Sequence, residues 1–232
     1  MLRVACLTLS HHVDARPVID VKSATNRDGS ALRVKSITED DIKRSVWIYF
    51  RKPGQSHMQL VANFSRNISN NMPSGLTTIV DWDRNGTHEI SIVKECGAGP
   101  NCTGDLFHIE PQTARMIRIF EGNTSFIEHL NGHLVEYGRS SCCSWEASVY
   151  KVSTDRLNIS AQPKFHVSMA IRESAPNGPY SITSKPSDTQ KDGKSKEAVY
   201  CQFFKTTPAG NKVIKPPPRF MRLCDYYRPF SD

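Results

Sequence analysis

The 232-residue sequence lacks several features that would assign it directly to a class of protein. It has no apolar run near the roughly 20 residues that a membrane-spanning helix needs. It also has no G-x-S-x-G, H-E-x-x-H or P-loop motif, so it carries no local signature of the common hydrolases, metalloproteases or nucleotide-binding enzymes. Amphipathic helical periodicity is scarce as well. The one helical candidate is the short segment Glu39–Arg44, with Thr38 as a possible N-cap.

What the chain does contain is a series of short segments rich in Val, Ile, Thr, Phe and Tyr, separated by Gly, Pro, Asn or Asp. This pattern predicts an all-β fold, an antiparallel sheet assembly with an incomplete β-propeller-like or sandwich arrangement. We expect one β domain over residues 16–172, a Ser-, Pro- and Lys-rich linker or loop over 173–197, and a basic C-terminal segment over 198–232. The strand candidates are residues 31–38, 45–51, 58–64, 76–80, 89–94, 105–110, 116–121, 133–137, 144–152, 165–171 and 199–205.

Acidic residues are fewer than basic ones, with 23 Asp and Glu against 30 Lys and Arg, which gives a net charge of +7. Residues 185–232 hold ten of the basic and five of the acidic residues, so this segment carries +5 of the +7. Aromatic residues are interleaved there, as in segments that bind nucleic acid by phosphate contacts and stacking. We instead favour a solvated tail, or one that meets an anionic envelope surface or an acidic protein, and expect no nucleic-acid partner.

The N-terminus resembles the end of a secretory signal peptide. Arg3 precedes a short apolar run from Val4 to Leu9, and small residues stand at the −3 and −1 positions of a cleavage site before Arg16. We therefore expect residues 1–15 to be removed and the protein to reach the periplasm or the exterior. A true start further upstream, or a frayed N-terminus without a signal, are the alternatives.

Cysteine usage agrees with export. Without Cys6, six cysteines remain, an even number that suits disulfides in an oxidising compartment. Spacing favours Cys96 with Cys102 and Cys201 with Cys224, whereas the adjacent Cys142 and Cys143 would take different partners or stay partly free. Glycosylation sequons begin at six asparagines, most of which we interpret as incidental: Asn63, Asn67, Asn85, Asn101, Asn123 and Asn158.

The most informative segment is residues 77–93, T-T-I-V-D-W-D-R-N-G-T-H-E-I-S-I-V. Counted from Asp81, oxygen-bearing side chains stand at positions 1, 3, 5 and 9, with Gly86 at position 6 for a sharp turn. Ca²⁺ collects about 6–8 oxygen ligands, and Asp-rich loops with this spacing supply them. We predict a calcium site with side-chain oxygens from Asp81, Asp83, Asn85 and Glu89 and a backbone carbonyl from Thr87.

This loop differs from an EF-hand, because position 12 is Ile92 and the flanking segments alternate like strands. It would therefore join two strands. The alternative is a metal-free β-hairpin in which Asn85-Gly86 alone shapes the turn.

From Thr77 to Val152, the calcium loop is followed by G-D-L-F-H-I-E, P-Q-T-A-R-M-I-R-I-F, N-G-H-L-V-E-Y-G-R and S-W-E-A-S-V-Y-K-V. This order resembles the repeat unit of bacterial FG-GAP/VCBS-type proteins, and more narrowly it is similar to small exported Gram-negative members that inhibit lysozyme-like peptidoglycan hydrolases. The resemblance covers about a third of the chain. The single loop, the Asn and Glu at two ligand positions and the many cysteines depart from that pattern, which argues against a complete propeller.

Two further groups are candidates for contacts with a partner or for chemistry. The G-R-S-S segment with Arg139, Ser140 and Ser141, close to Trp145, could contact a protein partner, although a hydrophilic turn is the simpler interpretation. His129 and His133 could bind a metal or pair with Cys142 or Cys143 as a nucleophile, but surface histidines and disulfides are the simpler interpretations.

Together these patterns predict a non-enzymatic, exported, calcium-binding protein-interaction module, an inhibitor or immunity protein against a lysozyme-like hydrolase. The alternatives are a calcium-stabilised cell-envelope hydrolase and a glycosylated secreted binding domain.

Overall fold

The computed structural model describes residues 17–40, 43–67, 77–97, 101–141, 144–172 and 198–225. Within these ranges the chain forms fourteen strands and one short 3₁₀ helix, so the predicted all-β fold is confirmed. Every pair of neighbouring strands is antiparallel, and the strands form three separate sheets, none of which closes into a barrel.

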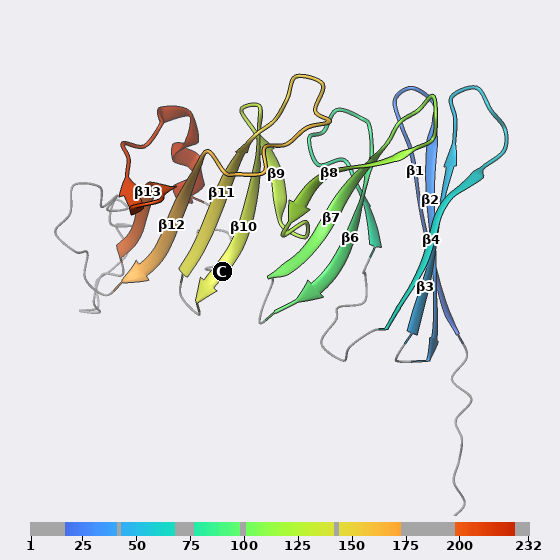
Figure 1. Ribbon diagram of the computed structural model, residues 1–232, viewed down its shortest axis with the longest axis horizontal. Coiled ribbons are helices and arrows are strands. Elements are labelled where there is room, and N and C mark those ends of the chain that lie inside the picture. Colours follow the sequence, from blue (N-terminus) through green and yellow to red (C-terminus); the bar gives the residue numbers. More distant parts are fainter. Residues whose placement is uncertain are drawn as a thin grey trace, which may run out of the picture.

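The sheets follow one another along the longest axis of the molecule, with sheet A at one end, sheet B in the middle and sheet C at the other end (Figure 1). Sheet A contains β1 (Val18–Thr25), β2 (Ala31–Asp40), β3 (Lys43–Arg51) and β4 (Gln59–Asn67). Sheet B contains β5 (Thr77–Val80), β6 (Glu89–Cys96), β7 (Cys102–Ile109) and β8 (Met116–Gly122).

Sheet C has the strand order β14-β13-β12-β11-β10-β9, and the 3₁₀ helix η1 (Pro218–Asp225) packs on it. Its strands are β9 (Ile127–Leu130), β10 (His133–Ser141), β11 (Ser144–Lys151), β12 (Phe165–Arg172), β13 (Ala198–Thr207) and β14 (Gly210–Val213). Because β13 pairs with β12 directly, residues from the C-terminal segment complete the same sheet as residues from the β domain.

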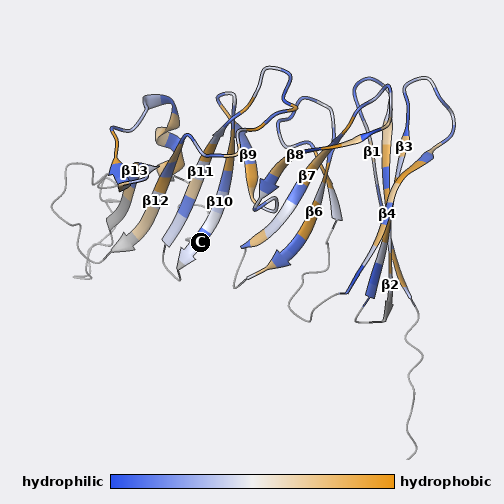
Figure 2. Ribbon diagram, viewed as in Figure 1, coloured by the Kyte–Doolittle hydropathy of each residue, from blue (hydrophilic) through white to orange (hydrophobic). Residues whose placement is uncertain are grey.

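Three main apolar cores lie between the sheets and beneath η1, and most strands contribute to them through alternating positions, whereas β1 and β14 supply none of their residues. Sheets A and B meet around Ile48 and Ile90, and sheets B and C meet around Leu106 and Leu134. The third core lies between sheet C and η1, where Phe220 is 1% exposed. Figure 2 shows apolar and polar residues alternating along the central strands. Strand β6 lies between two sheets, so five consecutive residues from Glu89 to Val93 are buried.

Several expectations need correction. The predicted helix at Glu39–Arg44 is wrong for the four of its residues that the structure describes. Glu39 and Asp40 end β2, and Lys43 and Arg44 begin β3. The C-terminal segment up to Leu223 is not a solvated tail, because Phe220 and Leu223 are buried in the core of sheet C.

Two of the expected disulfides are present, Cys96–Cys102 and Cys201–Cys224. The predicted signal at residues 1–15, the linker at 173–197 and the cysteines Cys142 and Cys143 lie outside the described residues. Among the described residues, no helix is long and apolar enough to span a membrane.

Candidate functional site

The predicted calcium loop connects β5 to β6 as a tight turn organised by the Asp81 carboxylate. Its two oxygens accept the backbone N–H groups of Asn85 at 3.0 Å and of Gly86 at 2.9 Å. The turn needs left-handed backbone at Arg84 (φ 57°) and Gly86 (φ 85°). A side chain at Gly86 would be strained in this conformation and would also press against Arg27, whose Cβ lies 3.3 Å from the position of an added Cβ. Gly86 is therefore required by the backbone path.

Asp83 is the most enclosed acid of the loop, with a side chain that is 1% exposed. Its Oδ1 accepts the Asn85 N–H at 3.2 Å, and its Oδ2 accepts the Asn85 side-chain amide at 2.9 Å. The guanidinium of Arg156, from the turn between β11 and β12, donates to the same Oδ2 at 2.5 Å. A cation from 73 residues away thus compensates the charge of Asp83.

Glu89, the first residue of β6, is 4% exposed, and its Oε2 has no hydrogen-bond partner. The other oxygen, Oε1, lies 3.4 Å from His108 Nδ1. Burial raises the pKa of Glu89 from 4.5 to about 7; the charges of Asp83 and Asp81 add to the increase, and the hydrogen bond with His108 opposes it. The His108 ring thus meets one oxygen of this buried carboxylate, and the other oxygen has no partner.

The donor set of the loop suits Ca²⁺ in its chemistry. The charges of Asp83 and Asp81 both oppose the ionisation of Glu89. Arg156 pairs with Asp83, and the His108 ring lies beside Glu89. An orphaned buried carboxylate oxygen, such as Oε2 of Glu89, is what a bound cation would satisfy. In the described part of the chain, however, no three His, Cys, Asp or Glu side chains are already grouped as metal ligands. Binding would require the loop side chains to rearrange.

The loop also touches all three sheets. The Asn26 side chain, in the turn between β1 and β2 of sheet A, accepts the N–H of His88 at 2.8 Å, and the Arg27 N–H donates to Gly86 O at 2.8 Å. Trp82, within the loop, is buried in the core between sheets B and C, and its ring packs edge-on against His129 at 5.7 Å. The loop therefore contacts each of the three sheets, and a rigid loop would help to hold them in place.

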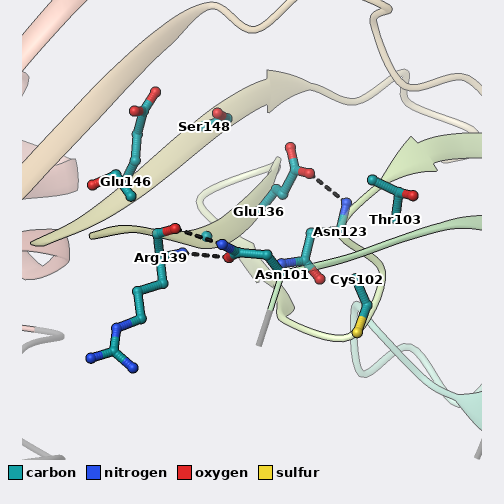
Figure 3. A pocket seen from close by; sticks show the side chains of 10 residues that line it. Asn101, Cys102, Thr103, Asn123, Glu136, Arg139, Glu146 and Ser148 are labelled. Atoms are coloured by element: carbon teal, nitrogen blue, oxygen red, sulfur yellow. Dashed lines mark hydrogen bonds between the residues drawn. The ribbon is translucent and has the colours of Figure 1, made fainter. Parts of the chain in front are cut away.

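A cavity of about 320 Å³ lies where sheet B adjoins sheet C, beside the end of β10 (Figure 3). The Asn101 side chain bridges the two sheets there: its amide donates to Arg139 O at 2.6 Å, and its Oδ1 accepts the Arg139 N–H at 2.7 Å. The polar residues that line the cavity are Asn101, Thr103, Asn123, Glu136, Arg139, Ser140, Glu146 and Ser148.

The two acids of the cavity differ in how they are held. Glu136 accepts hydrogen bonds from the Asn123 N–H at 2.5 Å and the Tyr150 hydroxyl at 2.7 Å, so both of its oxygens are occupied. Burial and this carboxylate raise the pKa of Tyr150. Glu146 is more exposed, and its Oε1 lies 3.2 Å from His166 Nδ1. Glu136 therefore has a structural role, whereas Glu146 is able to meet a ligand.

The structure separates the four predicted partner-binding residues. Arg139 and Ser140 are exposed on β10 beside the cavity, and they belong to a strand, not to a turn. Trp145 instead packs against the core of sheet C. Ser141 ends β10, and its side chain lies outside the described residues.

The histidine interpretation needs one correction. His133 is not a surface residue: it is 7% exposed, its ring packs edge-on against Phe220 at 5.1 Å, and burial lowers its pKa. His129 is half-buried, and its pKa is lowered by burial and by Arg156. Both rings therefore serve packing.

The sequons fall into two groups. Asn101 uses both amide atoms to hold Arg139, Asn85 is bonded within the loop, and Asn123 is 7% exposed, so a glycan at any of the three would displace internal contacts. Asn63, Asn67 and Asn158 are exposed.

Sequence reasoning missed Arg156, His108, Asn26 and the bridging role of Asn101. Arg156 and Asn26 reach the loop from distant turns, and His108 from the neighbouring strand β7, with no local motif. The sequence shows a sequon at Asn101, but nothing in the sequence indicates that Asn101 contacts Arg139.

Comparison with known proteins adds little. No protein-family model matches the chain, and no curated protein matches it. One solved structure, described as a Xanthomonas type IV secretion system related protein, aligns with 84% of this chain and 93% of its own length, at 8% sequence identity and a TM-score of 0.45.

Proposed function

We propose that this protein is an exported, calcium-stabilised protein-interaction module that inhibits a lysozyme-like peptidoglycan hydrolase. The calcium part of the proposal rests on the buried Glu89 carboxylate. Its Oε2 has no hydrogen-bond partner, and two further acids, Asp81 and Asp83, lie near it. Burying an ionised carboxylate is costly unless a counter-charge meets it. In this proposal Asp81, Asp83, Asn85 and Glu89 hold the ion with side-chain oxygens, and Thr87 adds its carbonyl.

Bound Ca²⁺ would supply positive charge to the loop and would carry out no chemistry on a substrate. The chain's own residues transmit the effect, because the loop is bonded to Asn26 in sheet A and contributes Trp82 to the core shared with sheet C. A rigid loop would therefore help to hold sheet C in place relative to sheet B, and Asn101 ties the end of β10 to sheet B. Loops and strand ends on a rigid scaffold are common positions for binding residues.

The partner surface in this proposal is the cavity rim with Arg139, Ser140 and Glu146. Arg139 and Ser140 are exposed, and Asn101 fixes the Arg139 backbone through two hydrogen bonds. A cation and an anion at the two sides of a cavity suit a partner with its own charged groups, such as a catalytic cleft with acidic residues. The inhibitory role itself rests on the resemblance to exported inhibitors, and the disulfides agree with an extracytoplasmic location.

The test is a cell-wall lysis assay with a panel of lysozyme-like hydrolases, carried out in Ca²⁺ and in chelator. We expect at least one hydrolase to be inhibited stoichiometrically, and Arg139→Glu to weaken inhibition about tenfold or more. Arg115→Glu, an equal charge change at an exposed position of the turn between β7 and β8, is the matched control and should leave inhibition unchanged.

Release of soluble peptidoglycan fragments by the protein alone would contradict the inhibitor role and favour the hydrolase alternative. Absence of inhibition across the panel would also overturn it. The mass of the native protein separates the glycosylated alternative, because glycans at Asn63, Asn67 or Asn158 would raise it above the mass of the bare chain.

A further inference from the structure

The outer face of sheet A, which is turned away from sheet B, is an apolar surface that the proposed function leaves unused. One face of sheet A is buried against sheet B through Leu32, Val34 and Ile48. Sheet A stands at the end of the row of sheets, and none of the elements described is stacked on its other face (Figure 1). The residues of this outer face that carry the argument are Ile19, Val21, Arg33, Lys35, Trp47 and Leu60.

Strand register places these residues in continuous rows. Residues that are directly opposite in antiparallel strands project from the same face. Val21 pairs with Lys35, and Lys35 pairs with Trp47. In the next row Arg33 pairs with Tyr49, which pairs with Leu60. The rows cross all four strands, so the face is a continuous surface.

The apolar side chains of this face are unusually exposed. Ile19 is 56% exposed, Val21 53% and Leu60 51%, and these are three of the six large hydrophobic residues that stand out as exposed in the described part of the chain. Trp47 lies between them in the central strand β3 and is half-buried. Clustered apolar residues around a Trp are typical of the energetic centre of a protein–protein interface, and Arg is enriched in such interfaces.

The charged residues of this outer face indicate which kind of partner it binds. Lys35 and Arg33 are the charged members of the three rows that start at Ile19, Val21 and Ser23, and these rows contain no carboxylate. The Lys35 ammonium lies 5.9 Å from the Trp47 ring centroid, so positive charge is held at the centre of the face. Two copies of this face would bring like charges together, which argues against self-association. An anionic membrane is also a poor fit, because such surfaces are bound by clusters of about 4–8 Lys or Arg residues.

We propose that the outer face of sheet A binds a second protein through an acidic apolar segment, in which Leu-, Ile- or Phe-type side chains cover Trp47 and flanking Asp or Glu side chains pair with Lys35 and Arg33. This surface lies at the opposite end of the molecule from sheet C (Figure 1). The protein could therefore hold this partner and a hydrolase at the same time. The inference depends on neither the calcium site nor the inhibitory role.

The test uses the full chain as bait for a displayed library of random peptides, followed by synthesis of the most enriched peptide. We expect the enriched peptides to combine acidic with large apolar residues and to bind more weakly as salt is raised. Trp47→Ala, Leu60→Ser and Lys35→Glu should each raise Kd, by about tenfold or more for Trp47 and Lys35. Replacing one peptide Glu with Lys should restore binding to the Lys35→Glu variant.

Matched controls lie at the other end of the molecule. Val213→Ser removes an exposed hydrophobic residue of β14, as Leu60→Ser does in β4, and Lys205→Glu reverses an exposed charge of β13. Both control variants should bind the peptide with unchanged Kd, and thermal melts should show that all variants are folded.

Several outcomes would overturn the proposal. One is a selection without acidic enrichment, or without any peptide whose binding depends on Trp47. Another is equal weakening by Lys205→Glu. Binding to phosphatidylglycerol vesicles in place of peptides would assign the face to a membrane, and a dimer in sedimentation that Trp47→Ala dissociates would assign it to a second copy of the chain.

Discussion

At the residue scale, ionisation of the buried Glu89 side chain lowers the free energy of unfolding, so its effect on stability depends on pH. Its folded pKa of about 7 lies above the ordinary 4.5, so between these values the native state holds a proton that the unfolded state releases. The contribution of Glu89 to stability is therefore complete below pH 4.5 and is lost as the pH rises through about 7. Without a bound ion, Glu89 should therefore make the protein less stable at pH 8 than at pH 5.

The matching variant is Glu89→Gln, which keeps the shape of the side chain and removes the titration. In chelator, we expect the wild type to lose up to about 3 kcal/mol of unfolding free energy between pH 5 and pH 8 relative to this variant. Urea unfolding of both proteins at the two pH values measures the difference, because all other titrating groups are shared. Equal pH dependence of the two proteins would show that Glu89 is ionised at little cost.

Gly104 of β7 gives a prediction about packing. A Cβ at this position would lie 2.5 Å from Ile92 O and 2.7 Å from Thr124 Oγ1, and the backbone oxygen cannot move without disturbing β6. Gly104→Ala should lower the unfolding free energy by about 1–3 kcal/mol. Gly138→Ala is the control, since its Cβ would meet only Asn101 Oδ1 at an ordinary 3.6 Å. Chemical denaturation of both variants tests this, and equal losses would refute the steric argument.

At the element scale, the turn that carries Arg156 competes with the ion in our account. Arg156 donates to the same Asp83 oxygen that we assign to calcium. Arg156→Gln should therefore strengthen calcium binding, by about tenfold, while it lowers the stability of the ion-free protein. Isothermal titration with Ca²⁺ measures the affinity, with Lys151→Gln as a charge-matched control in β11. Weaker calcium binding in Arg156→Gln would show that the guanidinium supports the site.

The element η1 depends on its disulfide as well as on its core contacts. Cys201–Cys224 closes a segment with a sequence separation of 23 and places Phe220 and Leu223 in the core of sheet C. Replacing both cysteines with Ser should cost about 3 kcal/mol, the value expected for a loop of this length. A melting temperature unchanged from the wild type would mean that the apolar contacts alone hold η1.

Most elements could be predicted from sequence because their period of two is a local property. The eleven predicted segments coincide with strands of the structure. Strand β1 was missed because Val18–Thr25 closely follows the segment interpreted as a leader. Strands β9 and β14 were missed because each has four residues and, unlike the equally short β5, neither is made of β-branched residues. The short helix η1 was missed because Pro218 and its basic neighbours resemble a solvated tail.

At the scale of the whole molecule, the loop from Asp81 to Glu89 is one place where contacts to all three sheets come together. Its spacing was visible in the sequence, and the two disulfides could be proposed from loop lengths. The partners of the loop could not, because Asn26 and Arg156 approach it only when sheets A and C have packed against sheet B. Long-range contacts of this kind leave no local pattern, and the same is true of the cavity beside Asn101.

The central claim, that calcium holds this junction, is tested most directly by thermal melts of the full chain in Ca²⁺ and in chelator, for the wild type and for Asp81→Ala. We predict that Ca²⁺ at about 100 times its Kd stabilises the wild type by about 2.7 kcal/mol and raises its Tm by several degrees. Asp81→Ala should melt at the same temperature in both conditions. Identical melting of the wild type with and without Ca²⁺ would contradict the account and leave the loop as a metal-free turn held by Arg156.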